Sequence, residues 1–156
     1  RGREFILRLT TGADVLKALT QFGVDHNIRF AKVHAAFMGG LQPAILKVWT
    51  PNTQDPTDWH TETPMVVHNL SMILSMSGMI SVRSDGQTER PYSVAHIVIG
   101  AGWDVPTTGG HLMEGSIVKG VVEVFITELL GIDVIVSPFK EHMRGSENWY
   151  AEKAKS

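Results

Sequence analysis

The sequence has 156 residues, of which 43% are hydrophobic and 19% are charged, as expected for one compact domain with a buried core. It contains no run of eighteen apolar residues, and its first residues match neither a signal peptide nor a transit peptide, so we expect a cytoplasmic protein without a membrane segment. The absence of cysteine excludes disulfides, thiolate metal sites and cysteine nucleophiles. The formal net charge of −2 argues against tight DNA binding through phosphate contacts.

The N-terminal part of the sequence predicts a strand followed by an amphipathic helix. Residues 4–9 alternate sufficiently in polarity to indicate a half-buried strand. Thr11 and Asp14 resemble a capping box, which commonly starts a helix. Four apolar residues follow at helical spacing: Val15, Leu16, Leu19 and Phe22. Asn27 then favours a left-handed backbone conformation, so we expect the helix to end near it.

The middle of the sequence predicts two strands and then a long loop. Residues 30–41 and 44–49 are apolar and strand-like, and the glycine pair at 39–40 followed by Pro43 predicts a bend between them. Residues 51–64 are polar and contain three prolines, which indicates a loop longer than most connections. We interpret Trp59 as an anchor for this loop rather than as a ligand-binding residue.

The remaining apolar segments predict a mainly antiparallel sheet. Ser84-Asp85-Gly86 is a turn signal between strands expected over residues 65–82 and 92–99. Further strands are expected over residues 112–118, 121–129 and 132–136. Residues 139–156 are expected to form a polar tail or a short helix capped by Ser146. Hairpins with one early helix indicate an α+β fold, and its exposed sheet edges favour oligomerisation.

Three of the seven histidines are candidate ligands for a divalent transition metal such as zinc. The histidine spacings match no standard zinc signature, so a site would have to gather residues that are distant in sequence. The candidates are His34, His96 and His111, because each lies in or at the start of a predicted strand. For any one of them alone, a hydrogen-bonded histidine in the core or at an interface is the commoner role.

The segment Gly-Gly-His-Leu-Met-Glu-Gly is the main candidate for a ligand site. Gly109 and Gly110 allow the backbone to turn tightly or to come close to another chain, and they precede His111 and Glu114. Together with His96 these four residues form the predicted ligand-binding set. In a regular strand His111 and Glu114 lie on opposite faces, so they would meet at one metal only through a bulge or a neighbouring subunit.

Other motifs give no catalytic assignment. Gly100-Ala101-Gly102 lacks the full glycine pattern and the following helix of a nucleotide-binding loop. No Gly-x-Ser-x-Gly elbow of a serine hydrolase is present. Glu123, inside an apolar strand, is expected to pair with Lys or Arg on another strand or subunit. Catalytic residues therefore stay unassigned.

These segments together resemble the plants-and-prokaryotes-conserved (PPC) domain in its stand-alone prokaryotic form. The most specific part is Gly-Gly-His-Leu-Met-Glu-Gly with the apolar strand that holds Glu123. The Ile-Leu-Ser-Met-Ser-Gly segment at residues 73–78, His96 and the Phe-Met-Gly-Gly segment at residues 37–40 support it. The resemblance covers about residues 4–128, so we expect residues 1–138 to form a single PPC-like domain.

The resemblance implies a homotrimer of α+β subunits. In land plants this domain follows an AT-hook that binds the minor groove of DNA, which implies that the PPC part assembles and recruits proteins. Here Arg1-Gly2-Arg3 is followed by Glu4 where an AT-hook needs proline, so no true hook is present. Met72 replaces a usual acidic residue and Val94 replaces one histidine of a His-x-His pair, which weakens a metal site inferred from the family. The alternative ligands are His34 and His68.

Three hypotheses follow from the sequence. The first is a homotrimeric regulatory or interaction domain that joins protein partners or DNA-associated complexes and has little DNA affinity of its own. The second is an enzyme or a small-ligand or metal-binding protein with His96, His111 and Glu114 at the subunit interface. In the third, His111 and Glu114 are hydrogen-bonding residues that only fix the packing of the trimer.

Overall fold

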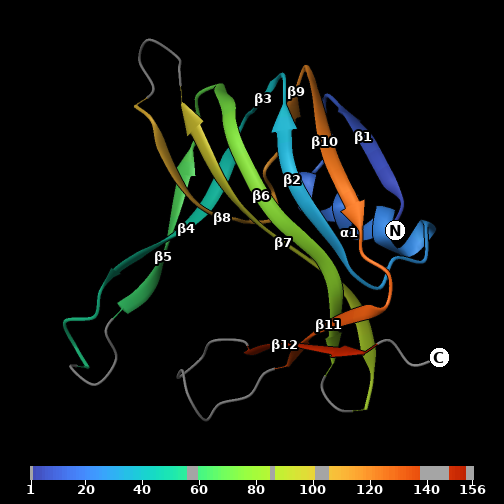
Figure 1. Ribbon diagram of the computed structural model, residues 1–156. Helices are drawn as coiled ribbons and strands as arrows, with labels where there is room; N and C mark the ends of the chain where they lie inside the picture. The colour runs from blue at the N-terminus through green and yellow to red at the C-terminus, as the bar shows by residue number, and fades with distance from the viewer. Residues whose placement is uncertain (1, 56–59, 85–86, 101–105, 138–147, 154–156) are drawn as a thin grey trace.

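The computed structural model describes residues 2–55, 60–84, 87–100, 106–137 and 148–153. These residues form one helix, α1 (Val15–Asp25), and one twelve-stranded sheet (Figure 1). The strands are β1 (Glu4–Thr10), β2 (Ala31–Phe37), β3 (Gly40–Leu41), β4 (Ala44–Pro51), β5 (His60–Val67), β6 (Ser71–Ser84), β7 (Glu89–Gly100), β8 (Thr108–Leu112), β9 (Val118–Lys119), β10 (Val121–Glu128), β11 (Ile132–Ser137) and β12 (Asn148–Lys153).

The main path of the sheet runs in the order β1-β10-β2-β6-β7-β8-β4-β5. Every neighbouring pair along this path is antiparallel, whereas β11 pairs with β6 in the parallel direction. The short strand β3 pairs with β6 and β9, and β12 pairs with β11. The mainly antiparallel sheet and the single described helix confirm the α+β class.

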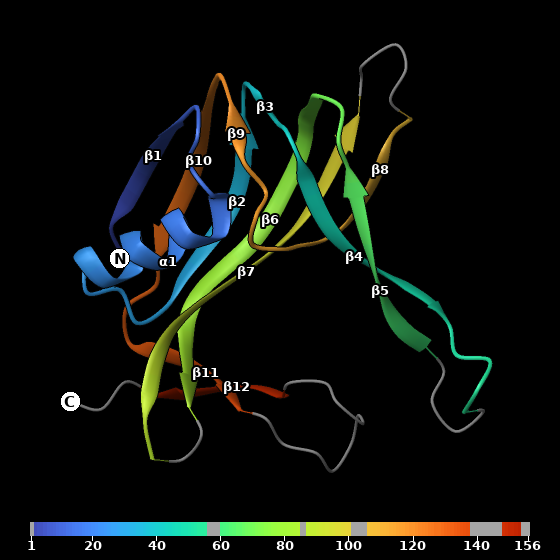
Figure 2. The same cartoon turned by 180° about the vertical axis from the view of Figure 1, so that it is seen from behind.

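Helix α1 covers one face of the sheet and forms the core with it (Figures 1 and 2). Asp14 caps the helix, since its carboxylate accepts a hydrogen bond from the Lys17 backbone N–H at 3.2 Å. Val15, Leu16 and Leu19 are buried, as their helical spacing predicted. Asn27 adopts φ 51° just beyond the helix, which confirms the predicted left-handed stop.

Two features of the middle segment follow the prediction. The bend between β2 and β4 contains Met38 and Gly39, both with positive φ, and a cis peptide bond before Pro43. The hairpin of β6 and β7 forms around the predicted turn, with Ser84 opposite Glu89.

Among the described residues, no helix is long and apolar enough to cross a membrane.

The prediction of a loop over residues 51–64 is wrong in its second half. Residues 60–64 belong to β5, which pairs with β4 from Ala44 opposite Val67 to Pro51 opposite His60. Because β5 is the last strand on the path of the sheet, it can contain a proline and mostly exposed polar residues. The single strand predicted over residues 65–82 is also wrong, because its first residues belong to β5, which ends at Val67, and β6 begins at Ser71. Trp59 lies outside the described residues.

Two predictions about the C-terminal half also need correction. The strand expected over residues 112–118 ends at Leu112, because the chain turns at Gly115, which has φ 89°. A polar tail or short helix is expected over residues 139–156. In the structure, residues 148–153 instead form strand β12, which pairs with β11. Ser146, the expected helix cap, lies outside the described residues.

The face of the sheet opposite α1 carries an exposed apolar patch, here called the outer patch. Five successive strands, β1, β10, β2, β6 and β7, contribute one residue each. The residues of the outer patch are Ile6, Phe125, Phe37, Leu74 and Val98, with exposed fractions from 36% to 63%. Ile6 lies directly opposite Phe125, so the patch is continuous across β1 and β10. No described helix covers this face, which is turned to the viewer in Figure 1 with α1 behind the sheet.

Candidate functional site

The site is organised around His96 and His111, which lie directly opposite each other on β7 and β8. Their ring centroids are 5.3 Å apart and the rings meet edge to face. On the other side of β8, Lys47 of β4 is the cross-strand partner of His111. Directly opposite residues project to the same face of a sheet, so these three side chains form one row across three strands.

Two glycines of β8 make this arrangement of strands possible. A Cβ atom on Gly110 would lie 2.6 Å from the Lys47 carbonyl oxygen of β4, and one on Gly109 would lie 2.5 Å from the Ile97 carbonyl oxygen of β7. Both distances are shorter than any ordinary contact of a methyl group with an oxygen. The close backbone approach of these glycines is therefore to neighbouring strands of the same chain, whereas the sequence predicts a tight turn or an approach to another chain.

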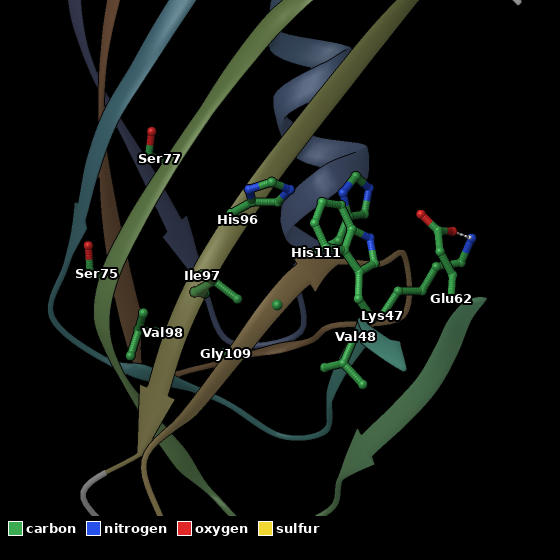
Figure 3. Close-up of a pocket in the computed structure, with 12 residues that line it drawn as sticks. Lys47, Val48, Glu62, Ser75, Ser77, His96, Ile97, Val98, Gly109 and His111 are labelled. Atoms are coloured by element: carbon green, nitrogen blue, oxygen red, sulfur yellow. Dashed lines mark hydrogen bonds and ion pairs between the residues drawn. The ribbon is translucent and has the colours of Figure 1, made fainter. Parts of the chain in front are cut away.

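The row opens into a cavity of about 510 Å³, which lies within the size range of small-molecule sites (Figure 3). It is lined by residues of β4 to β8. These are Lys47, Val48, Trp49, Glu62, Ser75, Ser77, His96, Ile97, Val98, Gly109, Gly110 and His111. Four of the five predicted ligand-binding residues thus lie together.

An ion pair closes one side of the cavity. Lys47 Nζ donates a hydrogen bond to Glu62 Oε2 at 2.9 Å. This hydrogen bond is the main reason that the pKa of Glu62 is lowered, and the charges of Lys47, His111 and His60 lower it further. The carboxylate of Glu62 therefore lies in a positive local potential.

The sequence prediction missed Lys47, Trp49 and Glu62. Glu62 lies in the loop predicted over residues 51–64, so the sequence does not indicate that it lies beside β4. Lys47 and Trp49 lie on the same face of the predicted strand over residues 44–49, and this alternation was the available signal. Trp49 is 64% exposed, and its ring centroid lies 4.7 Å from that of His60.

Glu114 does not line the cavity. It lies beyond the end of β8, where its carboxylate is exposed and 3.7 Å from Lys17 Nζ of α1. Because β8 ends at Leu112, Glu114 lies outside the strand, and the strand alternation expected for His111 and Glu114 does not extend to it. Glu123 forms a cross-strand ion pair with Arg8 at 2.8 Å, which confirms the pairing expected for it.

His34 is also separate from the two histidines of the cavity. It is exposed on β2, and β6 lies between β2 and β7. Among the described residues, no group of three His, Cys, Asp or Glu is placed to hold a metal ion. A single chain therefore offers a metal two adjacent imidazoles, whereas catalytic zinc sites usually have three protein ligands. The metal site over His34, His96 and His111 stays a prediction.

The family of the chain follows from a comparison with family models. The model of the Plants and Prokaryotes Conserved (PCC) domain matches residues 1–130. The chain belongs to this family. This PPC domain therefore has the family membership that its motifs indicated. A comparison with curated protein sequences gave no match.

Solved structures share the fold of this PPC domain. A metal-containing protein from Archaeoglobus fulgidus is 22% identical, with a TM-score of 0.74 over 96% of this chain and 94% of that chain. A plant- and prokaryote-conserved (PPC) protein from Pyrococcus horikoshii is 24% identical, with a TM-score of 0.70 over 94% and 92% of the two chains. A protein from Bacteroides thetaiotaomicron, provisionally named as DNA-binding, is 19% identical, with a TM-score of 0.73 over 96% and 93%.

Proposed function

We propose that this PPC domain is a homotrimeric regulatory or interaction domain that joins DNA-associated complexes through protein partners. The outer patch is the observation that carries the proposal. It exposes five large apolar side chains on five successive strands, and extended apolar surfaces of this kind mark protein interaction sites. A second and a third copy of the chain would cover it, as the resemblance to trimeric family members implies.

The charge of the chain supports a role without strong intrinsic DNA binding. The formal net charge is −2, and three arginines of the described residues are held by carboxylates: Arg3 by Glu128, Arg8 by Glu123 and Arg29 by Glu89. Similar folds provisionally named as DNA-binding support an association with DNA, and partners would supply most of the contact. In a gel-shift titration near 0.15 M salt, we expect a Kd no tighter than about 10⁻⁶ M, as for non-specific binding.

Acidic substitutions in the outer patch test the assembly. Ile6→Glu and Phe37→Glu place a charge where a partner copy would have to bury it, so we expect the molar mass to fall from about three times 17.2 kDa to that of one chain. Light scattering after size-exclusion chromatography measures this change. Val24→Glu is the matched control, because Val24 is 50% exposed on α1, away from the patch.

The assembly proposal fails if the unmodified chain has the mass of a monomer. It also fails if the two patch variants and the Val24→Glu control keep the same trimer mass. Tight DNA binding with a steep salt dependence would instead contradict the proposed lack of DNA affinity and leave the assembly result standing.

We propose as a second function that the cavity binds a small ligand or a divalent transition metal such as zinc. The observation that favours it is the adjacent pair of imidazoles, His96 and His111, in a cavity that also reaches Val98 of the outer patch. A neighbouring subunit placed on the patch would lie close enough to contribute the further ligands that one chain lacks. The metal-containing relative from Archaeoglobus fulgidus supports the same idea.

Metal analysis of the untagged oligomer tests the metal version. We expect about one metal per chain or per shared site, and its loss in His96→Ala and in His111→Ala. Glu114→Gln is the control, because Glu114 lies outside the cavity. Absence of stoichiometric metal, or full retention in both histidine variants, would contradict it. Dissociation of the His111→Ala trimer with unchanged metal per chain would favour the purely structural role of His111.

A further inference from the structure

A row of polar side chains crosses four strands along the cavity. Ser77 of β6 lies directly opposite His96 of β7, and His96 lies directly opposite His111 of β8. Lys47 of β4 is the cross-strand partner of His111 on its other side. Because neighbouring strands lie about 4.8 Å apart, the three spacings from β6 to β4 give this polar row a length of about 14 Å along the sheet. A ligand that contacts both ends of the row is therefore elongated.

Apolar surface lies beside the polar row. Ser75, two residues before Ser77 on β6, lies opposite Val98, and Val98 lies opposite Gly109. Residues two apart on a strand share one face, so Val98 is the neighbour of His96 on the cavity side of the sheet. Val98 and Trp49 are exposed apolar side chains, and both line the cavity. A molecule in the cavity thus meets polar groups together with apolar surface.

Each end of the polar row has hydrogen-bonding capacity that the chain leaves unused. The hydroxyls of Ser75 and Ser77 are exposed, and neither has a hydrogen-bond partner among the residues that the structure describes. Each hydroxyl can donate one hydrogen bond and accept others. At the other end, the 2.9 Å bond from Lys47 Nζ to Glu62 Oε2 leaves further N–H donors on the ammonium and a second carboxylate oxygen. Figure 3 shows the serines and this ion pair on opposite sides of the two histidines.

The charge of the cavity lining favours an uncharged ligand. Lys47 and Glu62 neutralise each other at hydrogen-bond distance. An anion would have to compete with Glu62 for Lys47, and a cation would have to compete with Lys47 for Glu62, so neither sign of charge has an advantage. A hydroxyl group can instead donate to the carboxylate and accept from the ammonium without separating the pair. Such bonds to charged groups are stronger than bonds between neutral groups.

We propose that this cavity binds an elongated, uncharged molecule with several hydroxyl groups, of which a disaccharide is the simplest kind. At one end the molecule bonds to the two serine hydroxyls, and at the other end it bonds to the Lys47–Glu62 pair. Its apolar C–H surface packs on Trp49 and Val98. The inference rests on the second proposed function in its small-ligand form and does not require a metal. It names the class of ligand and assigns no reaction to it.

Binding of simple sugars tests the class of ligand. Maltose, cellobiose and trehalose supply two uncharged rings in different relative orientations. Glucose supplies a single ring, which is too short to reach both ends of the polar row. Lactobionate supplies a similar length with a negative charge, and the deacetylated glucosamine dimer supplies two rings with positive charges. Calorimetry of the unmodified protein is expected to give saturable binding of at least one disaccharide with a Kd of about 1 mM or tighter, at least about tenfold tighter than glucose and both charged sugars.

Two substitutions locate the binding. Ser77→Ala should weaken the binding of the preferred disaccharide about two- to tenfold, because it removes one hydrogen bond. Trp49→Ala should weaken it at least about threefold, because it removes apolar surface that the ligand covers. Thr20→Ala is the matched control, because it removes a hydroxyl from α1, on the other face of the sheet. Denaturant unfolding of each variant measures whether the fold is retained.

The proposal is overturned if none of the three disaccharides saturates at millimolar concentration. It is equally overturned if glucose or a charged sugar binds as tightly, or if folded Ser77→Ala and Trp49→Ala both bind like Thr20→Ala. Metal content measured on the same samples reports the other form of the second proposed function. A protein that holds metal through His96 and His111 but binds no disaccharide refutes the ligand class alone. Light scattering reports the assembly separately, since a monomer that binds a disaccharide refutes only the first proposed function.

Discussion

Gly110→Val is expected to lower the free energy of unfolding by about 1–3 kcal/mol and to displace Lys47 from His111. A Cβ atom at position 110 would lie 2.6 Å from the Lys47 carbonyl oxygen and 3.2 Å from a methyl group of Val48. The first of these contacts is with backbone, which cannot move aside by changing a rotamer. Strand β8 would therefore have to separate from β4, and the cavity between them would widen. Denaturant unfolding measures the loss of stability.

Thr108→Val is the control for Gly110→Val, because it places the same side chain in the same strand at a half-buried position. We expect it to change the stability by no more than about 0.5 kcal/mol. Equal unfolding midpoints for Gly110→Val and the unmodified chain would show that β8 can carry a side chain at this position. In that case glycine would not be needed for the close approach of β8 to β4.

Glu128→Gln is expected to lower the free energy of unfolding by about 1–3 kcal/mol at neutral pH, because it removes the charge of a buried carboxylate from its ion pair with Arg3. The carboxylate of Glu128 is only 5% exposed and accepts hydrogen bonds from Arg3 Nε at 2.6 Å and Arg3 Nη2 at 3.0 Å. These bonds join β10 to the start of β1. Since Arg3 is half-exposed, water screens part of the interaction, and the lower part of the range is expected.

The effect of Glu128→Gln should depend on pH. The hydrogen bond from Arg3 lowers the pKa of Glu128, and the charge of Arg3 acts in the same direction, against the effect of burial. A lowered pKa in the folded state stabilises the fold fully above the pKa of an unfolded glutamate, about 4.3. This contribution is lost as the pH falls through the lower folded value. The stability difference between the two proteins should therefore be constant near pH 7 and shrink below about pH 4.

Glu123→Gln is the matched control for this measurement. Glu123 also pairs with an arginine across β1 and β10, but it is 21% exposed and Arg8 is 64% exposed. We expect a cost of no more than about 1 kcal/mol from such a surface pair. Similar losses for both variants, or a pH-independent loss for Glu128→Gln, would mean that burial adds nothing to the Arg3–Glu128 pair.

The helix and most strands could be predicted from sequence because their signals are local. The cap at Asp14 and the spacing of Val15, Leu16 and Leu19 define α1 without reference to the rest of the chain. Strand β5 was missed because an edge strand can be polar and contain Pro64. The end of β8 was missed because Leu112 and Ile117 are both apolar, and only the turn at Gly115 separates them.

The candidate site could be predicted only in part, for a physical reason. Gly109, Gly110 and His111 are marked by their own motif, and His96 lies in a recognisable strand. That His96 lies opposite His111 depends on the register of β7 and β8, which local sequence does not determine. The Lys47–Glu62 pair depends likewise on the pairing of β4 with a strand that was not predicted.

The joint between β4 and β8 has a thermodynamic consequence. Only two residue pairs of the described ladder connect these strands, Leu46 with Leu112 and Lys47 with His111, whereas β6 and β7 pair along most of their length. Separating the hairpin of β4 and β5 from the main sheet breaks these pairs and the hydrogen bonds of Ile45 with Met113 and Ser116, and it should cost less than global unfolding because the rest of the sheet stays paired. A ligand that touches both sides of the joint adds its binding free energy to the closed form. Occupancy of the cavity and closure of the sheet at this joint are thus coupled equilibria.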